Sequence, residues 1–176
     1  TLYGPSALAY DSTNQRLFVS DRSNHRVLVF DARVPGSSSF DFCANGTATT
    51  GLSNGMNASC VLGQANFSTS TAGTTASKFD TPEGLAHDAV NNRLFVADRI
   101  NRRVMAFDVT GVTNGENAVN VLGQVDFTTV AASAVTDSKF SAPFALAFDA
   151  TYNRLFMADT NHTRVLVFDV ASITNG

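Results

Sequence analysis

Short apolar runs, separated by polar residues, follow one another along the whole chain. In the first copy of this pattern they occupy positions 8–10, 17–19 and 27–30, and equivalent runs begin at positions 85, 94 and 104 and again at 146, 155 and 165. The runs are too short for helices and are rich in β-branched and aromatic residues, while the Asp, Asn and Ser residues between them favour turns. The pattern predicts three successive meanders of antiparallel strands.

The three meanders are copies of one sequence repeat. Residues 5–31, 82–108 and 143–169 align without gaps, and the first two copies share 16 of 27 positions. A fourth run, at residues 61–67, returns at 121–127 with the same Val-Leu-Gly-Gln start. The third copy has no such run. Its last residues, 174–176, match residues 113–115, which come just before the fourth run of the second copy. We therefore expect a repeat array with four-stranded sheets after the first two copies.

The predicted strands are apolar on both alternating faces, whereas a strand with one solvated face alternates apolar and polar residues. Both faces of each sheet must therefore be covered. Because no segment has the length and period of a covering helix, the sequence predicts sheets stacked on sheets, as in a β-propeller or a β-solenoid. We favour an all-β propeller arrangement of about three blades in a single domain, 1–176. The expected blades are residues 1–67 with an insert at 32–60, residues 79–127, and residues 140–176 without a fourth strand.

The second copy carries the most informative motif. Residues 82–108 read Pro-x-Gly-Leu-Ala-x-Asp, then Leu-Phe-Val-Ala-Asp, then Asn-x-Arg-Val-x-x-Phe. In this respect the chain resembles the NHL-repeat β-propellers, and its long repeat spacing and recurring Val-Leu-Gly-Gln-x-x-Phe segment are similar to secreted bacterial members of that family. The resemblance spans nearly the whole chain outside the insert. It implies a propeller fold whose loops carry the functional differences between members, and it implies no particular activity.

The insert contains the only two cysteines, Cys43 and Cys60. A disulfide between them would close a loop of about 17 residues and would imply an oxidising compartment. The alternative is two unrelated, reduced thiols. In a secreted, extracellular protein, four Asn-x-Ser/Thr sequons could also accept N-linked glycans. These sequons begin at Asn45, Asn57, Asn66 and Asn161.

Charged residues recur with the repeat, and nine of the 15 acidic residues fall at three repeated positions. An Asp at a strand end can accept hydrogen bonds from the backbone N–H groups of the following turn, and an Arg five residues after the second Asp is placed to pair with it. A structural role is therefore predicted for three pairs. They are Asp21 with Arg26, Asp98 with Arg103, and Asp159 with Arg164.

The alternative interpretation is enzymatic. The Asp residues could converge on the propeller channel and bind a divalent cation, as in a metal-dependent lyase or hydrolase whose other ligands come from further blades. Against this, His25, His87 and His162 occupy three different positions in the repeat, and no Gly-x-Ser-x-Gly turn is present. We therefore predict no catalytic residue, metal ligand or cofactor.

Some NHL propellers bind RNA through a basic face, but here the net charge is −3 and only two lysines occur. That balance lacks the basic excess that nucleic-acid binding requires, and no run of about 18 apolar residues could span a membrane. We expect instead a non-enzymatic extracellular scaffold that binds proteins through the turns between the second and third strands of each blade, which share one rim. The expected contact residues are Arg22, Asn24, His25, Arg99, Asn101, Arg102, Thr160 and His162.

The blade count predicts partners as well, because closed propellers have about four to eight blades and three cannot close alone. Other copies of the chain or further blades must cover the two outermost blade faces. A ring of two chains, a longer propeller of which this is a section, and a head-to-tail filament with the chain as a structural fibre subunit all satisfy that requirement.

Overall fold

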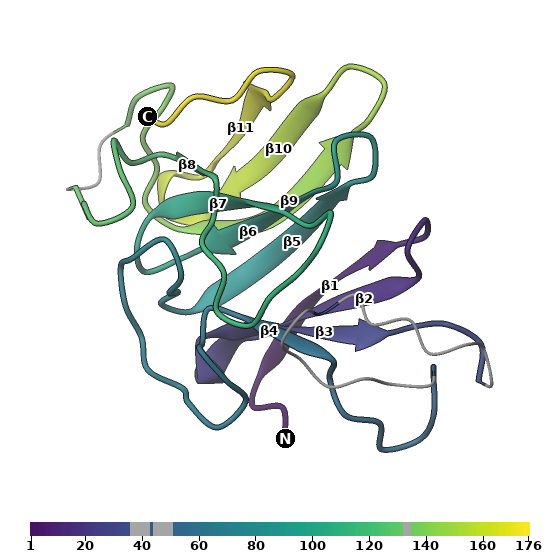
Figure 1. The fold of residues 1–176 in the computed structure, drawn as a ribbon. Helices are drawn as coiled ribbons and strands as arrows, with labels where there is room; N and C mark the ends of the chain where they lie inside the picture. The colour runs from purple at the N-terminus through teal and green to yellow at the C-terminus, as the bar shows by residue number, and fades with distance from the viewer. Residues whose placement is uncertain (36–42, 44–50, 132–134) are drawn as a thin grey trace.

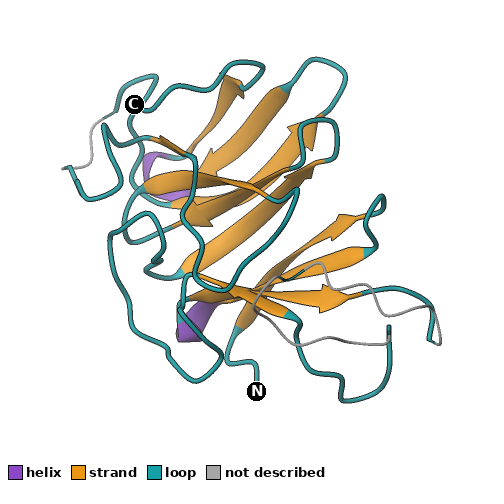
Figure 2. Ribbon diagram, in the orientation of Figure 1, coloured by secondary structure: helices purple, strands orange, loops and turns teal. Residues whose placement is uncertain are grey.

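The computed structural model describes residues 1–35, 43, 51–131 and 135–176. Three antiparallel β-sheets follow one another along the chain and stack side by side, coloured purple to blue, teal, and green to yellow in Figure 1. Apart from two short 3-10 turns, η1 (Arg22–Asn24) and η2 (Thr160–His162), the regular elements in these ranges are strands, as Figure 2 shows. The predicted all-β fold of antiparallel sheets is confirmed.

The first two sheets each have four strands in sequence order, and the third has three strands within the described residues. The first sheet comprises β1 (Pro5–Asp11), β2 (Arg16–Asp21), β3 (Arg26–Asp31) and β4 (Cys60–Leu62). The second comprises β5 (Pro82–Asp88), β6 (Arg93–Asp98), β7 (Arg103–Asp108) and β8 (Asn120–Leu122). The third comprises β9 (Pro143–Asp149), β10 (Arg154–Asp159) and β11 (Arg164–Asp169).

The fourth strands are shorter than the apolar runs from which we expected them. β4 begins at Cys60, a residue that the sequence pattern assigns to the insert, and ends at Leu62. The next residue, Gly63, has a φ of 85°, a left-handed conformation that glycine adopts without steric cost. A Cβ at this position would lie 2.2 Å from Cδ2 of Phe79. The chain therefore leaves the sheet at Gly63, and the Phe79 ring fills the space that a side chain would occupy.

The apolar core lies between the sheets, as the two-faced strands require. β5 packs against both β1 and β9, so the first strands of the three sheets are neighbours. Between the first and second sheets, Phe18 and Val29 are buried with Leu94 and Phe107. Between the second and third sheets a separate cluster contains Phe95, Val104, Leu155 and Met157 among its buried members. Each sheet contact thus buries one face of each partner.

The outermost faces of the array remain open. Leu8 in β1 is 64% exposed, whereas the equivalent Leu85 in β5 is 6% exposed because the first sheet covers it. At the other end, Val165 in β11 is 63% exposed, whereas the equivalent Val27 is fully buried. Exposed apolar sheet faces of this kind indicate contact surfaces.

Candidate interaction rim

Three equivalent turns lie at the same end of the sheets, joining the second strand of each sheet to the third. They comprise residues 22–25, 99–102 and 160–163, and we call this end of the array the rim. The last residue of each turn has a left-handed backbone, with φ of 50° at His25, 53° at Arg102 and 50° at Thr163. Three different side chains therefore occupy the same strained turn position, because the repeat fixes the backbone there.

An Asp–Arg ion pair lies beneath each turn. Arg26 Nε lies 2.7 Å from the Asp21 carboxylate, and Arg103 Nε lies 2.7 Å from that of Asp98. In the third sheet the equivalent Arg164–Asp159 distance is 3.3 Å. These arginines also donate to backbone carbonyls of the preceding loops, as Arg103 does to Lys78 at 2.8 Å. The pairs therefore tie the turn to the loop that enters the blade.

The other carboxylate oxygen of each Asp is used differently from our expectation. Asp21 Oδ1 accepts from the backbone N–H of Tyr3 at 2.6 Å, and Asp98 Oδ1 accepts from that of Asp80 at 2.7 Å. Asp159 Oδ1 likewise accepts from Ala142 at 3.0 Å. We expected donors from the following turn. The donors come instead from the segment entering the first strand, because the end of the second strand lies beside it in the antiparallel sheet.

The environments of these carboxylates differ between blades. Burial raises the pKa of Asp98 to about 6, although the Arg103 charge and the Asn101 amide act against that shift. For Asp159, burial would also raise the pKa, but backbone N–H groups of Ala142 and Ser141 outweigh it, and the net shift is downward. Of these two carboxylates, Asp98 in the second blade is therefore the more strongly desolvated.

Three of the expected contact residues point into their own blade. Asn24 Nδ2 donates to Asp21 at 2.8 Å, and Asn101 Nδ2 donates to Asp98 at 2.8 Å. His162 Nδ1 lies 2.8 Å from Asp159 at the same repeat position. Asn101 is only 3% exposed. These side chains therefore complete the Asp–Arg pairs and are not positioned for contact with a partner.

Arg22 and His25 bridge the first and second blades. Arg22 Nε lies 3.2 Å from Oε1 of the buried Glu83, and the Arg22 side chain itself is 48% exposed. His25 Nδ1 accepts from the Thr81 backbone N–H at 3.1 Å. Glu83 was not singled out in the sequence, because its position in the repeat is occupied by Ser6 and Phe144 in the other copies.

A small cavity of about 140 Å³ opens on the rim between the second and third blades. Arg99, Arg102 and Asn161 are among its lining residues. Arg102 donates to the Ala131 carbonyl at 3.2 Å, and the Thr160 hydroxyl donates to the Ala142 carbonyl at 3.1 Å. The accessible part of the rim therefore includes Arg22, Ser23 and Ile100, the half-buried Arg99 and Arg102, and the exposed residues of the third turn.

The remaining repeated Asp residues bind their own turns. Asp11 Oδ1 accepts from the backbone N–H groups of Thr13 and Asn14, both at 3.0 Å, and its Oδ2 lies 2.5 Å from Arg16. Burial would raise the pKa of Asp11, but these hydrogen bonds and the Arg16 charge hold it below its usual range. Among the described residues, no three His, Cys, Asp or Glu side chains are grouped so that they could hold a metal ion.

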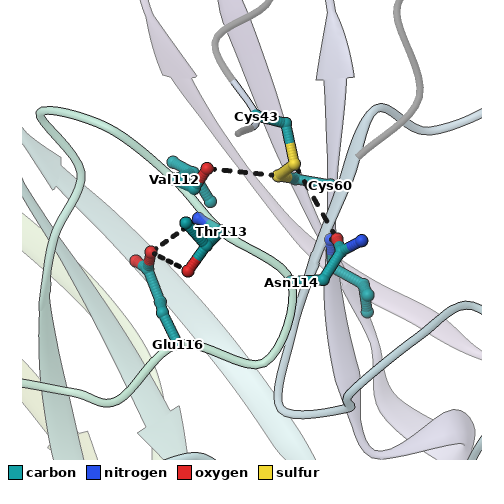
Figure 3. Close-up of a disulfide and its surroundings, with 7 residues drawn as sticks. Cys43, Cys60, Val112, Thr113, Asn114 and Glu116 are labelled. Atoms are coloured by element: carbon teal, nitrogen blue, oxygen red, sulfur yellow. Dashed lines mark hydrogen bonds between the residues drawn. A yellow bond between two sulfur atoms is a disulfide. The ribbon is translucent and has the colours of Figure 1, made fainter. Parts of the chain in front are cut away.

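The two cysteines form a disulfide in the structure, with Cα atoms 5.7 Å apart. Figure 3 shows it beside residues 112–114 of the second blade, where Cys60 Sγ lies 3.6 Å from the Val112 carbonyl. Both cysteines are fully buried. The disulfide thus joins Cys60, at the start of β4, to Cys43, which pairs with Val112 of the second blade in an isolated bridge. Much of the insert between the two cysteines lies outside the described residues.

The structure describes three of the four sequon asparagines. Asn57, Asn66 and Asn161 are all exposed, so each is accessible to a glycan, and Asn45 lies outside the described residues. Asn66 Oδ1 accepts from the backbone N–H groups of Ser68 and Thr69 at 2.9 and 3.2 Å, which orders the sequon as an Asx turn. The described residues contain no helix long and apolar enough to cross a membrane.

Comparisons with known proteins identify the repeat. Residues 2–30 match the family model for the NHL repeat. Over 93 residues the chain is 30% identical to human NHL repeat-containing protein 2 and 29% identical to the Bos taurus protein of that name. That match covers 53% of this chain but only 12% of each relative, so the chain spans a small part of their length. The resemblance to NHL repeats noted in the sequence is therefore supported.

Solved structures place the fold among β-propellers. The chain aligns over 97% of its length with 46% of a chain in the nidogen/laminin complex, with a TM-score of 0.54 and 15% identity. It aligns over 98% of its length with 37% of the Myceliophteria thermophila Cps50 (Swd1) β-propeller domain, with a TM-score of 0.52 and 9% identity. The three sheets are thus blades of a partial β-propeller, as predicted.

Proposed function

We propose that this chain is an NHL-repeat β-propeller module that assembles with other copies or further blades and acts as an extracellular, non-enzymatic scaffold for protein interactions. The observation that carries the proposal is the use of the repeated charged residues. In each blade the second Asp pairs with an Arg and with backbone N–H groups, and the first and third Asp bind turn N–H groups. These charged residues are engaged within their own blades and the segments that enter them, which leaves the exposed rim and the open blade faces as the surfaces for binding.

The proposed partners are proteins. The net charge of −3 supports a protein partner over nucleic acid, since few Lys and Arg side chains remain to neutralise phosphates. The disulfide and the exposed sequons support an oxidising, extracellular location. The similarity of the Val-Leu-Gly-Gln segments to those of secreted bacterial NHL proteins supports the same location.

No specific observation favours the metal-dependent lyase or hydrolase. The cavity between the first strands of the three blades has a volume of about 200 Å³, and Glu83 contributes the one carboxylate among its lining residues. That carboxylate is already paired with Arg22.

The rim can be tested with a matched pair of triple variants. In the rim variant, Arg22→Ala, Arg99→Ala and Thr160→Ala change one equivalent position in all three turns. In the control variant, Thr13→Ala, Val90→Ala and Thr151→Ala change exposed residues at one equivalent position of the turns at the opposite end of the sheets. The probe is a displayed library of random peptides selected on the wild-type protein.

We expect selected peptides to bind the control variant with wild-type affinity and the rim variant at least about tenfold more weakly, since loss of a few contacts costs more than 1.4 kcal/mol. Equal affinity for both variants would remove the rim from the proposal. Secretion into an oxidising compartment, followed by intact-mass measurement, tests the location, because a protein that stays reduced and unglycosylated there would contradict it.

A further inference from the structure

A loop of the second blade reaches across to the outermost strand of the first. Asn114 Oδ1 accepts from the backbone N–H of Val61 in β4 at 2.9 Å, and the Gly115 N–H donates to the Val61 carbonyl at 2.9 Å. Figure 3 shows Asn114 in this position, next to Cys60. One Asn-Gly dipeptide therefore satisfies both backbone groups of a strand residue at an otherwise open sheet edge.

The third blade makes the same contact with the second. Asn175 Oδ1 accepts from the Val121 N–H in β8 at 3.0 Å, and the Gly176 N–H donates to the Val121 carbonyl at 3.3 Å. Val61 and Val121 are equivalent residues, each the first in a Val-Leu-Gly-Gln sequence. We call this Asn-Gly arrangement the clamp. Each clamp binds the fourth strand of the blade that precedes it.

The first blade carries a clamp of the same shape, Asn54 and Gly55. The Met56 N–H donates to the Ser53 carbonyl at 3.2 Å, as the Glu116 N–H donates to Thr113 at 3.3 Å in the engaged clamp. The φ of Gly55 is 72°, close to the 69° of Gly115. The turn is therefore already formed before any strand is bound.

This first clamp has no strand to bind within the described residues. Asn54 is exposed there and makes no side-chain hydrogen bond to them. A Cβ on Gly115 would lie 3.0 Å from Cα of Ala65 in the preceding blade, whereas a Cβ on Gly55 would meet no atom of the described residues within 4 Å. The space that the first blade fills beside Gly115 is open beside Gly55.

The apolar residues around the first clamp are open in the same way. Leu52 is 46% exposed, whereas its equivalent Val112 is fully buried against the first blade. Next to it lies an apolar cavity of about 750 Å³, whose lining includes Leu8, Leu17 and Met56. The equivalents of Leu8 and Leu17 are Leu85 and Leu94, which are 6% and 0% exposed under the first blade. A blade packed here would bury the same set of positions a second time.

We infer that Asn54, Gly55 and this apolar face form a docking site for a complete four-stranded blade of the same repeat, bound through a fourth strand of Val-Leu-Gly-Gln type. The inference rests on the proposed scaffold function and names the partner of one of its surfaces. The incoming sheet presents a row of Ala, Phe and a small aliphatic residue, as the first blade does with Ala9, Phe18 and Val29 toward the second.

The occupant must bring a fourth strand that is not already bound. In the described chain, β4 is held by Asn114 and β8 by Asn175, and the third sheet has three strands there. β11 can receive a fourth strand, because it is the edge strand of the third sheet within the described residues and is the equivalent of β3, which pairs with β4 in the first sheet. A third blade completed in this way has the strand that the first clamp fits.

The test extends the chain in the pattern of its own repeat. Residues 116–131 are repeated after Gly176, which supplies a fourth strand to the third blade, and the mass of the particle is measured by sedimentation velocity over a range of concentrations. We expect the extended chain to associate through the third blade of one copy and the first blade of another. Asn54→Ala is expected to weaken that association about tenfold, the effect of losing one well-formed hydrogen bond with its partner left unsatisfied.

Two comparisons make the result decisive. Asn117→Ala, a change of the same type at an exposed residue of the second blade, is expected to leave the association unchanged, and Leu52→Asp is expected to abolish it. An extended chain that stays monomeric, or that associates equally with Ala at position 54, would overturn the inference. Peptide binding by the rim would be unaffected in that case, so the proposed function is tested separately.

The unextended chain provides an independent test that does not need the added strand to fold. Asn114→Ala is expected to lower its thermal midpoint by several degrees, because the engaged clamp joins two blades, while Asn54→Ala is expected to leave the midpoint unchanged. Equal destabilisation by the two changes would show that Asn54 is already engaged within the chain, and the docking site would then not exist.

Discussion

Arg103 and Asp98 form an ion pair 2.7 Å long in which neither side chain is exposed to solvent. The equivalent pair of the third blade, Arg164 and Asp159, is 3.3 Å long, and its Arg side chain is 22% exposed. The same sequence position therefore carries the same pair in two environments. The difference arises because the second blade is covered on both faces and the third on one.

Replacement of Arg103 by Met should destabilise the protein severely. The substitution keeps the aliphatic packing but leaves the Asp98 carboxylate buried without its cation, which typically costs about 3–5 kcal/mol. Arg164→Met removes the equivalent cation where water reaches the site, and we expect a loss of about 1 kcal/mol. Urea denaturation at constant pH measures both. Equal losses at the two positions would contradict the importance of blade burial.

Gly84 allows β5 and β9 to approach closely. A Cβ at this position would lie 2.4 Å from the Phe144 carbonyl oxygen and 2.8 Å from the Leu146 nitrogen, both backbone atoms that cannot move independently of β9. We expect Gly84→Ala to cost about 1–3 kcal/mol through separation of the second and third blades. Gly111→Ala is the matched control, since a Cβ there meets nothing within 4 Å in the part of the chain that the structure describes. A Gly84→Ala protein as stable as this control would show that the blades do not need the close contact.

Stability should fall as the pH rises through the range in which Glu116 ionises. Burial raises the pKa of Glu116 to about 7 from a usual 4.5, against the hydrogen bonds that it accepts from Thr113. Between these two values the folded protein holds a proton that the unfolded chain has lost, so folding is most favoured at the acidic end of the window. Above about pH 7 both states are ionised and the dependence ends.

Glu116→Gln isolates this effect from Asp98, whose pKa is raised in the same direction to about 6. The variant should match the wild type near pH 5 and exceed it at pH 8 by roughly 1–2 kcal/mol, a value reduced from the full linkage because the side chain is not fully buried. Denaturant titrations of both proteins at several pH values provide the measurement. Parallel pH profiles would be inconsistent with a raised pKa at Glu116.

Reduction of the Cys43–Cys60 disulfide should destabilise the first two blades. The two cysteines are 17 residues apart in the sequence, and a loop of that length corresponds to about 3 kcal/mol in the chain-entropy model. The double variant Cys43→Ser, Cys60→Ser should therefore unfold at lower denaturant concentration, and a reducing agent should shift the wild type to the same midpoint. A wild-type midpoint that does not respond to reductant would contradict this expectation.

The strands and their order could be predicted from the sequence because the same apolar pattern occurs in all three copies of the repeat. The inward direction of Asn24 and Asn101 could not, since a polar residue in a turn between strands is usually exposed, and only the assembled Asp–Arg pair gives it a buried partner. The hydrogen bonds from the entering loop to Asp21, Asp98 and Asp159 could not be predicted either. They are tertiary contacts, which no local pattern encodes.

The clamp was present in the sequence as a match between residues 113–115 and 174–176, yet Asn-Gly is also a common turn sequence. Its role is a property of the folded chain, in which Asn114 Oδ1 lies 2.9 Å from the Val61 nitrogen and Asn175 Oδ1 lies 3.0 Å from the Val121 nitrogen. The signal that could have found it is the recurrence of Asn-Gly, with the Asn seven residues before the Val of each Val-Leu-Gly-Gln strand, at a position where a simple loop would be free to vary.

The clamp joins blades through the main chain of the strand it binds. At Val61 and Val121 it contacts only an N–H and a carbonyl, and the residues that precede them, Cys60 and Asn120, differ completely in chemistry. These main-chain hydrogen bonds do not depend on the side chain of the bound valine, although at the second junction the Asn120 amide also donates to Asn175 Oδ1 at 3.3 Å. The side-chain fit between blades comes from their apolar faces. Because a repeat carries both an Asn-Gly clamp and a fourth strand, duplication or loss of one whole repeat in the gene keeps the two halves of the junction together, and arrays of different length can arise in this way.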